Sequence, residues 1–507
     1  MEHPPVFLYL PSRKFEPLTP EIMKIQKTVF LLSASLLLLH CSPKDQTNQI
    51  PSDALASAGQ QYVMPKDLAY RLEFTPHRPL PGLSPAAKKE AYLQPLIDEM
   101  LLAEAAADLR LDTNRVYQFK VKEIEKDEVR EALYFADVES KTNITDQQYS
   151  EALRRSRQEL LLKYMTFQTR EEAEYIRSLL ARGEANFQEA FEIVYKAGLE
   201  PPSVNVRWGQ MQPQIEDRVY GLEKGQVTDI IETPEGFMIM QLDSVKDVTP
   251  RSTEKYEEHK RKTRQRLEER VLNKASKEYV LSAMEEVSID VNNEGISILH
   301  QYIKQRQPEK PQQTNPDTLR AALPTREVRW KLDLPPEEKK TKLATFDNRT
   351  WTVQDFLEIA LGRGLKMPDK SKAAPVWLKN TLGQLIRDEV LADIGYQRGL
   401  DTTAVVRHKV NRWENYYRSN LYAEYLESQR QDSGEFTSAM RQTLDSLKTV
   451  HPPQINEKQF QQLDLNDTQM IVMKRGSFNR LAVPPYPQSF LKLHYPVQDS
   501  VLTNQNE

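Results

Sequence analysis

Apolar side chains recur three and four positions apart over residues 86–136, which is the period of an amphipathic helix. Two such stripes follow one another within this stretch, and the break between them falls at residues 111–113. We expect either Asp112 or Thr113 to cap the helix that follows the break, because short polar side chains accept hydrogen bonds from the free amides of a helix start. The segment therefore predicts two successive helices.

The same pattern returns 289 positions later. Residues 96–121 align without a gap on residues 385–410, and both segments contain Leu-Asp-Thr at the break. Shorter parallels flank them: residues 62–68 with 350–356, and a helix followed by a short extended segment at 254–292 with 436–456. Repetition at a fixed spacing indicates an internal duplication.

Between the helices of the first copy lies a segment with a different period. Residues 160–167 are rich in β-formers, Thr169 and Glu172 form a capping box for a helix over 170–182, and Gly183 ends that helix. The pattern then predicts a second helix over 187–194, a strand over 204–208, a helix over 215–220 and strands at 230–231 and 237–242. The order βααβαββ predicts a small α+β domain inserted in the first copy.

The N-terminal region predicts export. From Met23, two lysines precede an apolar run over residues 28–39 that is too short to span a bilayer, and Cys41 follows it. This arrangement resembles the bacterial lipoprotein signal, in which the cysteine is lipidated after cleavage. His40 stands where that signal has a small residue, so an ordinary signal peptide or an uncleaved anchor is the alternative.

Composition excludes several classes of function. The 507 residues exceed one ordinary core, and a net charge of −4 supplies no field for binding nucleic acid. With one cysteine, the chain forms no internal disulfide, and the eight histidines never occur at metal-ligand spacing. We therefore expect no metal and no cofactor.

These observations predict a mainly helical α+β protein with the following organisation. The expected parts are a signal at 23–41, a tether at 42–59, helical copy 1 at 60–159, the inserted domain at 160–248, a helix completing copy 1 at 253–304, a linker at 305–340, helical copy 2 at 341–462 and a C-terminal tail at 463–507.

The inserted domain resembles the parvulin-type (PpiC, rotamase) peptidyl-prolyl isomerases. The resemblance covers about 85 residues and rests on ordered short motifs: Glu-Ala-Glu at 172–174, Trp-Gly at 208–209, Ile-Glu-Asp at 215–217, Gly-Gln-Val-Thr at 225–228 and Gly-Phe-Met-Ile at 236–239. Together with the flanking helical segments, it is similar to the SurA and PrsA class of extracytoplasmic folding chaperones. In that class, helical arms form a cradle for unfolded clients.

The resemblance implies a proline-binding pocket, and it assigns Tyr164, Trp208, Met211, Ile215 and Met238 to that pocket. Parvulins use two histidines behind it, one on the first strand and one on the last. Here Tyr164 and Met238 occupy those positions, so no residue is assigned a catalytic role. Plain packing in the core is an equally good interpretation of Trp208, Met211, Ile215 and Met238 taken one at a time.

The function predicted from these features is that of a periplasmic folding factor of the bacterial cell envelope, lipid-anchored at Cys41 in the outer membrane. It binds unfolded or proline-containing envelope polypeptides, and its isomerase activity is weak or lost. Two alternatives stay open: an active peptidyl-prolyl cis-trans isomerase, and a non-catalytic adaptor or structural lipoprotein.

Overall fold

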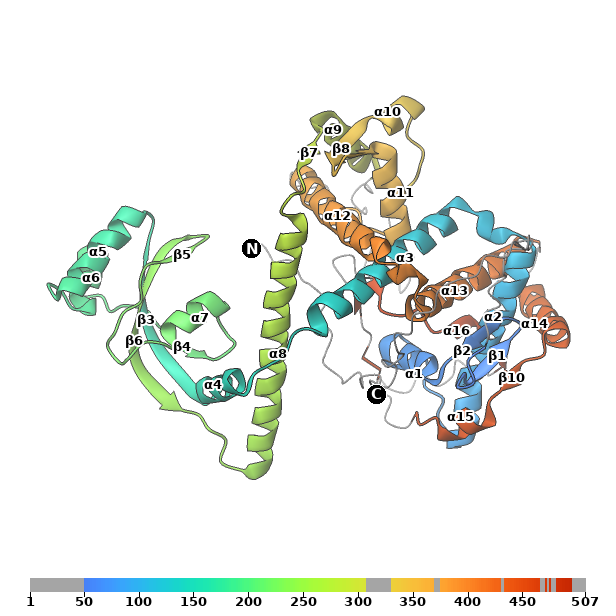
Figure 1. The fold of residues 1–507 in the computed structure, drawn as a ribbon, viewed down its shortest axis with the longest axis horizontal. Coiled ribbons are helices and arrows are strands. Elements are labelled where there is room, and N and C mark those ends of the chain that lie inside the picture. The colour runs from blue at the N-terminus through green and yellow to red at the C-terminus, as the bar shows by residue number, and fades with distance from the viewer. Residues whose placement is uncertain are drawn as a thin grey trace, which may run out of the picture. The chain divides into compact units, whose positions relative to one another are not determined.

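The computed structural model describes residues 50–306, 330–368, 374–429, 433–465, 470–471, 474–475 and 480–494. The chain forms two units (Figure 1). We call residues 137–279 the module and the remainder the helical body. The predicted signal with Cys41 lies outside the described residues, as does most of the predicted linker. None of the described helices is long and apolar enough to cross a membrane.

The module is built on a four-stranded antiparallel sheet with the order β4-β3-β6-β5. Its elements in chain order are α4 (Asp146–Ser156), β3 (Gln158–Phe167), α5 (Arg170–Arg182), α6 (Phe187–Val194), β4 (Ser203–Arg207), α7 (Pro213–Val219), β5 (Ile231–Thr233), β6 (Gly236–Asp247) and α8 (Thr253–Met284), whose last turn passes into the helical body. From β3 to β6 the order is βααβαββ, as predicted.

Local sequence accounts for these boundaries. The Thr169 side chain accepts from the amide of Glu172, the Glu172 carboxylate accepts from the amide of Thr169, and Gly183 ends α5 with a positive φ of 69°. Alternation along β3 sends Leu160 and Leu162 to one face of the sheet and Met165 and Phe167 to the other. The sheet therefore has an apolar core on each face.

The predicted range of the inserted domain is too narrow. Ala152 of α4 and Leu267 of α8 belong to the same buried cluster as Leu160 and Leu162. Helix α4 precedes the β-rich run and α8 follows the last strand. The alternation of apolar and polar residues along the strands therefore gave no sign that either helix completes the core of the domain.

The helical body contains two lobes. The first lobe consists of β1 (Ala56–Ala58), β2 (Gln61–Val63), α1 (Pro65–Phe74), α2 (Pro85–Asp108), α14 (Ser433–Val450), β10 (Gln454–Ile455), α15 (Glu457–Gln462) and α16 (Gln488–His494). The second lobe consists of β7 (Ile289–Val291), α9 (Asn293–Arg306), α10 (Pro336–Lys340), β8 (Lys342–Phe346), β9 (Arg349–Thr352), α11 (Val353–Arg363) and α12 (Ala374–Gln397). A short hairpin, β11 (Lys474–Arg475) and β12 (Arg480–Leu481), follows α15 in the chain.

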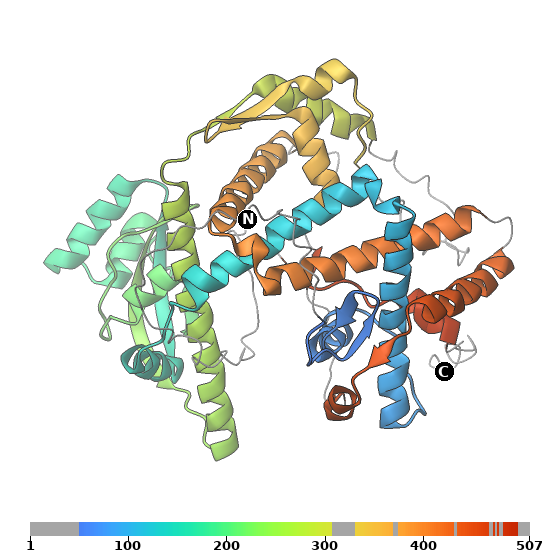
Figure 2. The same cartoon turned by 45° about the vertical axis from the view of Figure 1, so that its right-hand side comes forward.

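Two further helices join the lobes. They are α3 (Arg115–Tyr134) and α13 (Ala404–Ser428), which are preceded by 3-10 turns at Leu111–Thr113 and Leu400–Thr402; a π-helix at Phe135–Glu139 follows α3. Figure 2 shows α3 lying between α12 and α13, and α13 packs along α2. Helices α2 and α12 begin and end 289 positions apart, and the 3-10 turns have the same spacing.

The two lobes have matching three-stranded sheets, and each takes its outer strand from elsewhere in the chain. Ile455 of β10 pairs with Ala56 of β1, and Val291 of β7 pairs with Ala344 of β8, all antiparallel. Ala56 and Ala344 hold the same place in the hairpins that lead into α1 and α11. The first lobe is therefore closed only when residues from near both ends of the described chain come together.

The contact between α3 and the second lobe is close and ionic. A side chain at Gly362 would meet the Phe119 carbonyl oxygen at 2.6 Å, so the glycine permits the approach. The buried Arg363 guanidinium forms ion pairs of 2.7 Å with Glu123 of α3 and Asp388 of α12. Burial by itself raises the pKa of Asp388, but Arg130 and Arg363 outweigh that effect and hold this pKa below its usual range.

Three expectations from sequence were wrong in detail. The predicted tether at 42–59 includes β1, and Leu55 beside it is fully buried. The predicted tail at 463–507 includes α16, whose Phe490 and Leu493 are buried in the first lobe. Both segments have low local periodicity, so the sequence carries no sign that they are ordered. Their order comes from pairing with distant parts of the chain. Asn114, rather than Asp112 or Thr113, caps α3 by accepting from Val116 and Tyr117.

The predicted linker at 305–340 also contains ordered core. Trp330 and Leu334 are buried in the second lobe, and the Trp330 indole donates a 2.7 Å hydrogen bond to the Leu365 carbonyl. The proline-rich composition around these residues concealed them. The segment that lies outside the described residues, 307–329, stays a predicted linker.

Replacing Arg363 with methionine leaves Glu123 and Asp388 buried without the guanidinium that they share. We expect the helical body to lose about 3–5 kcal/mol of stability, which a lower urea midpoint would report. The matched control is Lys340→Met, because the Lys340 ion pair with Glu337 is exposed and its loss costs about 1 kcal/mol or less.

The difference in stability between wild type and Arg363→Met should depend on pH. Because the pKa of Asp388 is lower in the folded protein than in the unfolded chain, ionised Asp388 stabilises the fold. This stabilisation is complete above the unfolded carboxyl pKa of about 4, and it is lost as the pH falls below that value. The gap between wild type and Arg363→Met should therefore narrow in acid. Equal midpoints at neutral pH would contradict the role given to Arg363.

Candidate functional site

The five residues that the sequence assigned to a pocket lie together in the module. Tyr164 is on β3, Met211 precedes α7, Ile215 is on α7 and Met238 is on β6, and all four pack against the cluster that contains Trp208. Tyr164 lies opposite Met240 in the β3–β6 ladder, and Met238 lies opposite Thr166, so both side chains are on the sheet face that α7 covers. The structure therefore brings the predicted set together.

Their exposure divides them into two groups. Tyr164, Met211, Ile215 and Met238 are half-buried, whereas Trp208 is 4% exposed. The Arg270 guanidinium lies 4.7 Å from the centre of the Trp208 ring and covers it. A surface of three flexible or branched apolar side chains and one phenol is thus left for a ligand, while the packing of Trp208 is that of a core residue.

Glu216 holds the loop and the helix of this site in place. Its carboxylate is fully buried, accepts a 2.7 Å hydrogen bond from the Gly209 amide and forms a 2.7 Å ion pair with Arg270 of α8. A buried carboxylate needs both charge and hydrogen-bond partners to offset desolvation. The sequence offers no sign of this connection, because Arg270 stands in a long run of charged residues from which nothing local distinguishes it.

Gly209 allows α8 to approach the same loop. Its φ is +90°, and a side chain there would collide with Arg266 of α8. Arg266 itself donates a 2.9 Å hydrogen bond to the Trp208 carbonyl. The loop that precedes Met211 and Ile215 is therefore fixed to α8 by two arginines, Arg266 and Arg270.

The site offers little acid–base chemistry. Tyr164 is the one member of the set with an ionisable side chain, and His259 is the module's single histidine. His259 lies where α4 meets α8: its Nε2 is 2.9 Å from the Ser156 hydroxyl, and burial followed by the charge of Arg157 lowers its pKa. Among the residues that the structure describes, no group of three His, Cys, Asp or Glu side chains is placed to hold a metal ion.

An apolar surface of this kind suits a bound proline or another apolar side chain. Rotation about a prolyl amide requires no nucleophile, because the barrier of about 18–20 kcal/mol falls when the twisted amide is held and desolvated. The arrangement can therefore bind, but it lacks the imidazole pair that would orient hydrogen bonds behind the amide.

The aromatic side chains of α13 are placed for packing. Trp413 is buried, and its ring lies 5.8 Å from the ring of Tyr417 in a stacked arrangement. Tyr425 is the most exposed of the aromatic residues on this helix. The Lys120 ammonium of α3 lies 4.9 Å from the centre of the Tyr417 ring, so Tyr417 contacts a neighbouring helix, whereas Tyr425 lies at the surface.

Residues 146–260 match the family model of the PPIC-type PPIase domain. The module is therefore a parvulin-type domain, as the sequence motifs predicted. The match begins at α4 and ends within α8, which agrees with the contribution of both helices to the core. No curated protein matches the chain.

Several solved structures are similar to parts of the chain. Peptidylprolyl isomerase PrsA from Bacillus cereus is 19% identical over 29% of this chain and 52% of its own, with a TM-score of 0.20. PrsA from Bacillus anthracis is 19% identical over 37% of this chain and 96% of its own, also at 0.20. A Campylobacter jejuni structure from work on PEB4 and Cj1289, described as SurA-like chaperones, is 15% identical over 42% of this chain and 88% of its own, at 0.19.

The chain spans about half the length of the Bacillus cereus protein. The assignment of the module rests on the family match.

Replacing Arg270 with leucine leaves the buried Glu216 carboxylate without its cation. We expect the module to lose about 3 kcal/mol of local stability, because an uncompensated buried charge is costly. Hydrogen exchange at the β3 and β6 amides should accelerate by roughly 100-fold, since 1.4 kcal/mol corresponds to a factor of ten. Lys274→Leu, one turn further along α8 at a 77% exposed side chain, is the control and should leave exchange unchanged. Unaltered exchange in Arg270→Leu would refute the role of this ion pair.

Proposed function

We propose that this protein is an exported folding chaperone that binds unfolded polypeptides and isomerises prolyl bonds weakly or not at all. The observation that carries the proposal is a parvulin-type module that presents Tyr164, Met211, Ile215 and Met238 together, without an imidazole, on the sheet face that α7 covers. Apolar side chains of this kind, methionine above all, adapt to varied partners. The clients are unfolded or proline-containing polypeptides of the cell envelope.

The substitution of both family histidines supports binding over catalysis. A phenol donates one proton, and a thioether donates none, so Tyr164 and Met238 do not replace a pair of imidazoles in a hydrogen-bond framework. The family description of the module favours a second candidate, an active peptidyl-prolyl isomerase. A non-catalytic adaptor with a single folded partner is the third.

We further propose that the helical body arose by internal duplication. The constant spacing of 289 positions between α2 and α12 and the equivalent pairing of β10 and β7 support it. In this proposal the first copy received the parvulin-type module after α3, whereas α13 leads almost directly into α14. Two lobes of one design would give the chaperone two client-facing surfaces.

Export and anchoring form the last part of the proposal. The signal at residues 23–41 directs the chain to the periplasm of a bacterial cell envelope, and a lipid on Cys41 attaches it to the outer membrane. The similar PrsA and SurA-like proteins agree with a role in protein folding but do not address the anchor.

The chaperone and isomerase candidates are separated by two assays on the same preparation. We expect the protein to suppress aggregation of several chemically unfolded proteins, while the isomerisation rate of a proline tetrapeptide stays within about twofold of the uncatalysed rate. Met211→Ala and Met238→Ala should weaken client binding, whereas Tyr175→Ala, at an exposed position of α5, should not. Catalysis well above background that is lost in either methionine variant would establish the active isomerase instead. Binding of one folded partner alone would establish the adaptor.

The lipid anchor is tested by replacing Cys41 with alanine. Without the thiol no lipid can be attached, so the protein should move from the membrane fraction to the soluble periplasmic fraction. Ser42→Ala leaves the cysteine in place and serves as the matched control. Unchanged membrane association of Cys41→Ala would contradict the proposed anchor without bearing on client binding.

A further inference from the structure

Each lobe of the helical body combines the first part of one proposed copy with the second part of the other. The first lobe is built on α1 and α2 from copy 1, where α13 packs along α2 and β10 completes the sheet. The second lobe is built on α11 and α12 from copy 2, where α3 packs on both helices and β7 completes the sheet. The two copies are therefore intertwined.

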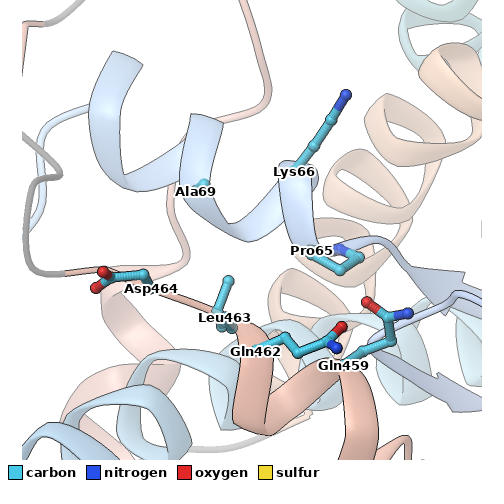
Figure 3. A pocket seen from close by; sticks show the side chains of 7 residues that line it. All are labelled: Pro65, Lys66, Ala69, Gln459, Gln462, Leu463 and Asp464. Atoms are coloured by element: carbon cyan, nitrogen blue, oxygen red, sulfur yellow. The ribbon is translucent and has the colours of Figure 1, made fainter. Parts of the chain in front are cut away.

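Figure 3 shows the same exchange beside α1. Pro65 and Ala69 of α1 line an open pocket of about 210 Å³ together with Gln459 and Gln462 of α15. Helix α15 follows β10 in the chain, so it also comes from the second half of the sequence. A helix from near the start of the described chain thus lies beside one from near its end.

Two glycines of the second lobe admit α3. A side chain at Gly362 of α11 would meet the Phe119 carbonyl oxygen at 2.6 Å, and a side chain at Gly395 of α12 would collide with a methyl group of Val129. Val129 is fully buried and β-branched, so its side chain has little freedom to move aside. The close approach of α3 therefore depends on glycine at both positions.

The first lobe has larger side chains at the corresponding positions. Gly395 corresponds to Ala106 at the spacing of 289, and Gly362 corresponds to Phe74 in the register that aligns the capping boxes of α1 and α11. Ala106 is fully buried. If α3 docked on the first lobe as it docks on the second, Val129 would collide with the Ala106 methyl group. Shape therefore excludes α3 from the first lobe.

Charge distinguishes the two docking helices as well. Glu123 of α3 and Arg412 of α13 stand 289 positions apart and carry opposite charges. Glu123 pairs with Arg363 of the second lobe at 2.7 Å. Arg412 pairs with the buried Asp67 of the first lobe. Burial by itself raises the pKa of Asp67, but Arg412 and His408 outweigh that effect and hold this pKa below its usual range. Exchanging the two helices would bury carboxylate against carboxylate in the first lobe and guanidinium against guanidinium in the second, which is costly.

We propose that α3 and α13 carry docking faces that make each copy close on the other copy and not on a second copy of itself. The partner of each docking face is the lobe of matching shape and opposite charge within the same chain. One chain thereby forms the intertwined pair that two single-copy chains would otherwise form, and it is monomeric. The inference rests on the proposed duplication and is independent of client binding.

Cutting the chain between the copies tests this pairing. A specific protease site within residues 307–329 of the Cys41→Ala protein allows cleavage after folding. We expect the uncut protein to have the mass of one chain by size-exclusion chromatography with light scattering, and the two fragments to stay together at that mass after cleavage. Fragments that separate, or an uncut protein with the mass of two chains, would refute the proposal. The proposed chaperone function would stand in either case, because suppression of aggregation is measured separately on the uncut protein.

Gly395→Ala tests the match between α3 and the second lobe. Alanine favours a helix more than glycine does, so a loss of stability in this variant reports the collision with Val129. We expect the cleaved fragments of Gly395→Ala to separate in about 0.5 M less urea than those of the unsubstituted protein. Val129→Ala should restore part of this loss in the double variant, because it removes the colliding methyl group.

Gly383→Ala is the matched control on the same helix. A side chain at Gly383 would meet no atom of the described residues within 4 Å, so the fragments of this variant should separate in no less urea than those of the unsubstituted protein. Equal urea midpoints for Gly395→Ala and Gly383→Ala would show that Gly395 does not select α3.

Discussion

The pairing of β10 with β1 is the contact on which the helical body depends. It joins Ile455 to Ala56, so the first lobe exists only when segments from opposite ends of the described chain meet. Closing so long a loop costs conformational entropy that local contacts do not recover. Tyr486 and Phe490 help to offset this entropy cost, because they are buried in the same core as Leu55. The ends of the helical body are therefore structural parts of it.

A second constraint acts where α3 meets the second lobe. Gly362 lets the helices approach, and Arg363 then shares its charge between Glu123 and Asp388 within the contact. Buried ion pairs add little net stability, because the cost of removing the charges from water offsets their attraction. They do require the charged groups to meet in one geometry. Through this one guanidinium, α3 is joined to both α11 and α12.

The module follows the same logic on a smaller scale. Glu216 is buried between the Gly209 amide and Arg270, and this connection positions Met211 and Ile215 through the loop and α7. The apolar surface beside it needs no acid–base pair in order to bind.

Local pattern determined a large share of this protein. The capping box at Thr169, the stop at Gly183 and the alternation along β3 are short-range effects, so the βααβαββ order was readable from the sequence. The grouping of Tyr164 with Met238 came from the resemblance to parvulins. What only the tertiary structure decided involves partners far apart: strand β1 inside an expected tether, Phe490 inside an expected tail, and Arg270 on Glu216. A short strand or a single arginine carries no periodic signal, and its order comes from the distant surface that it completes.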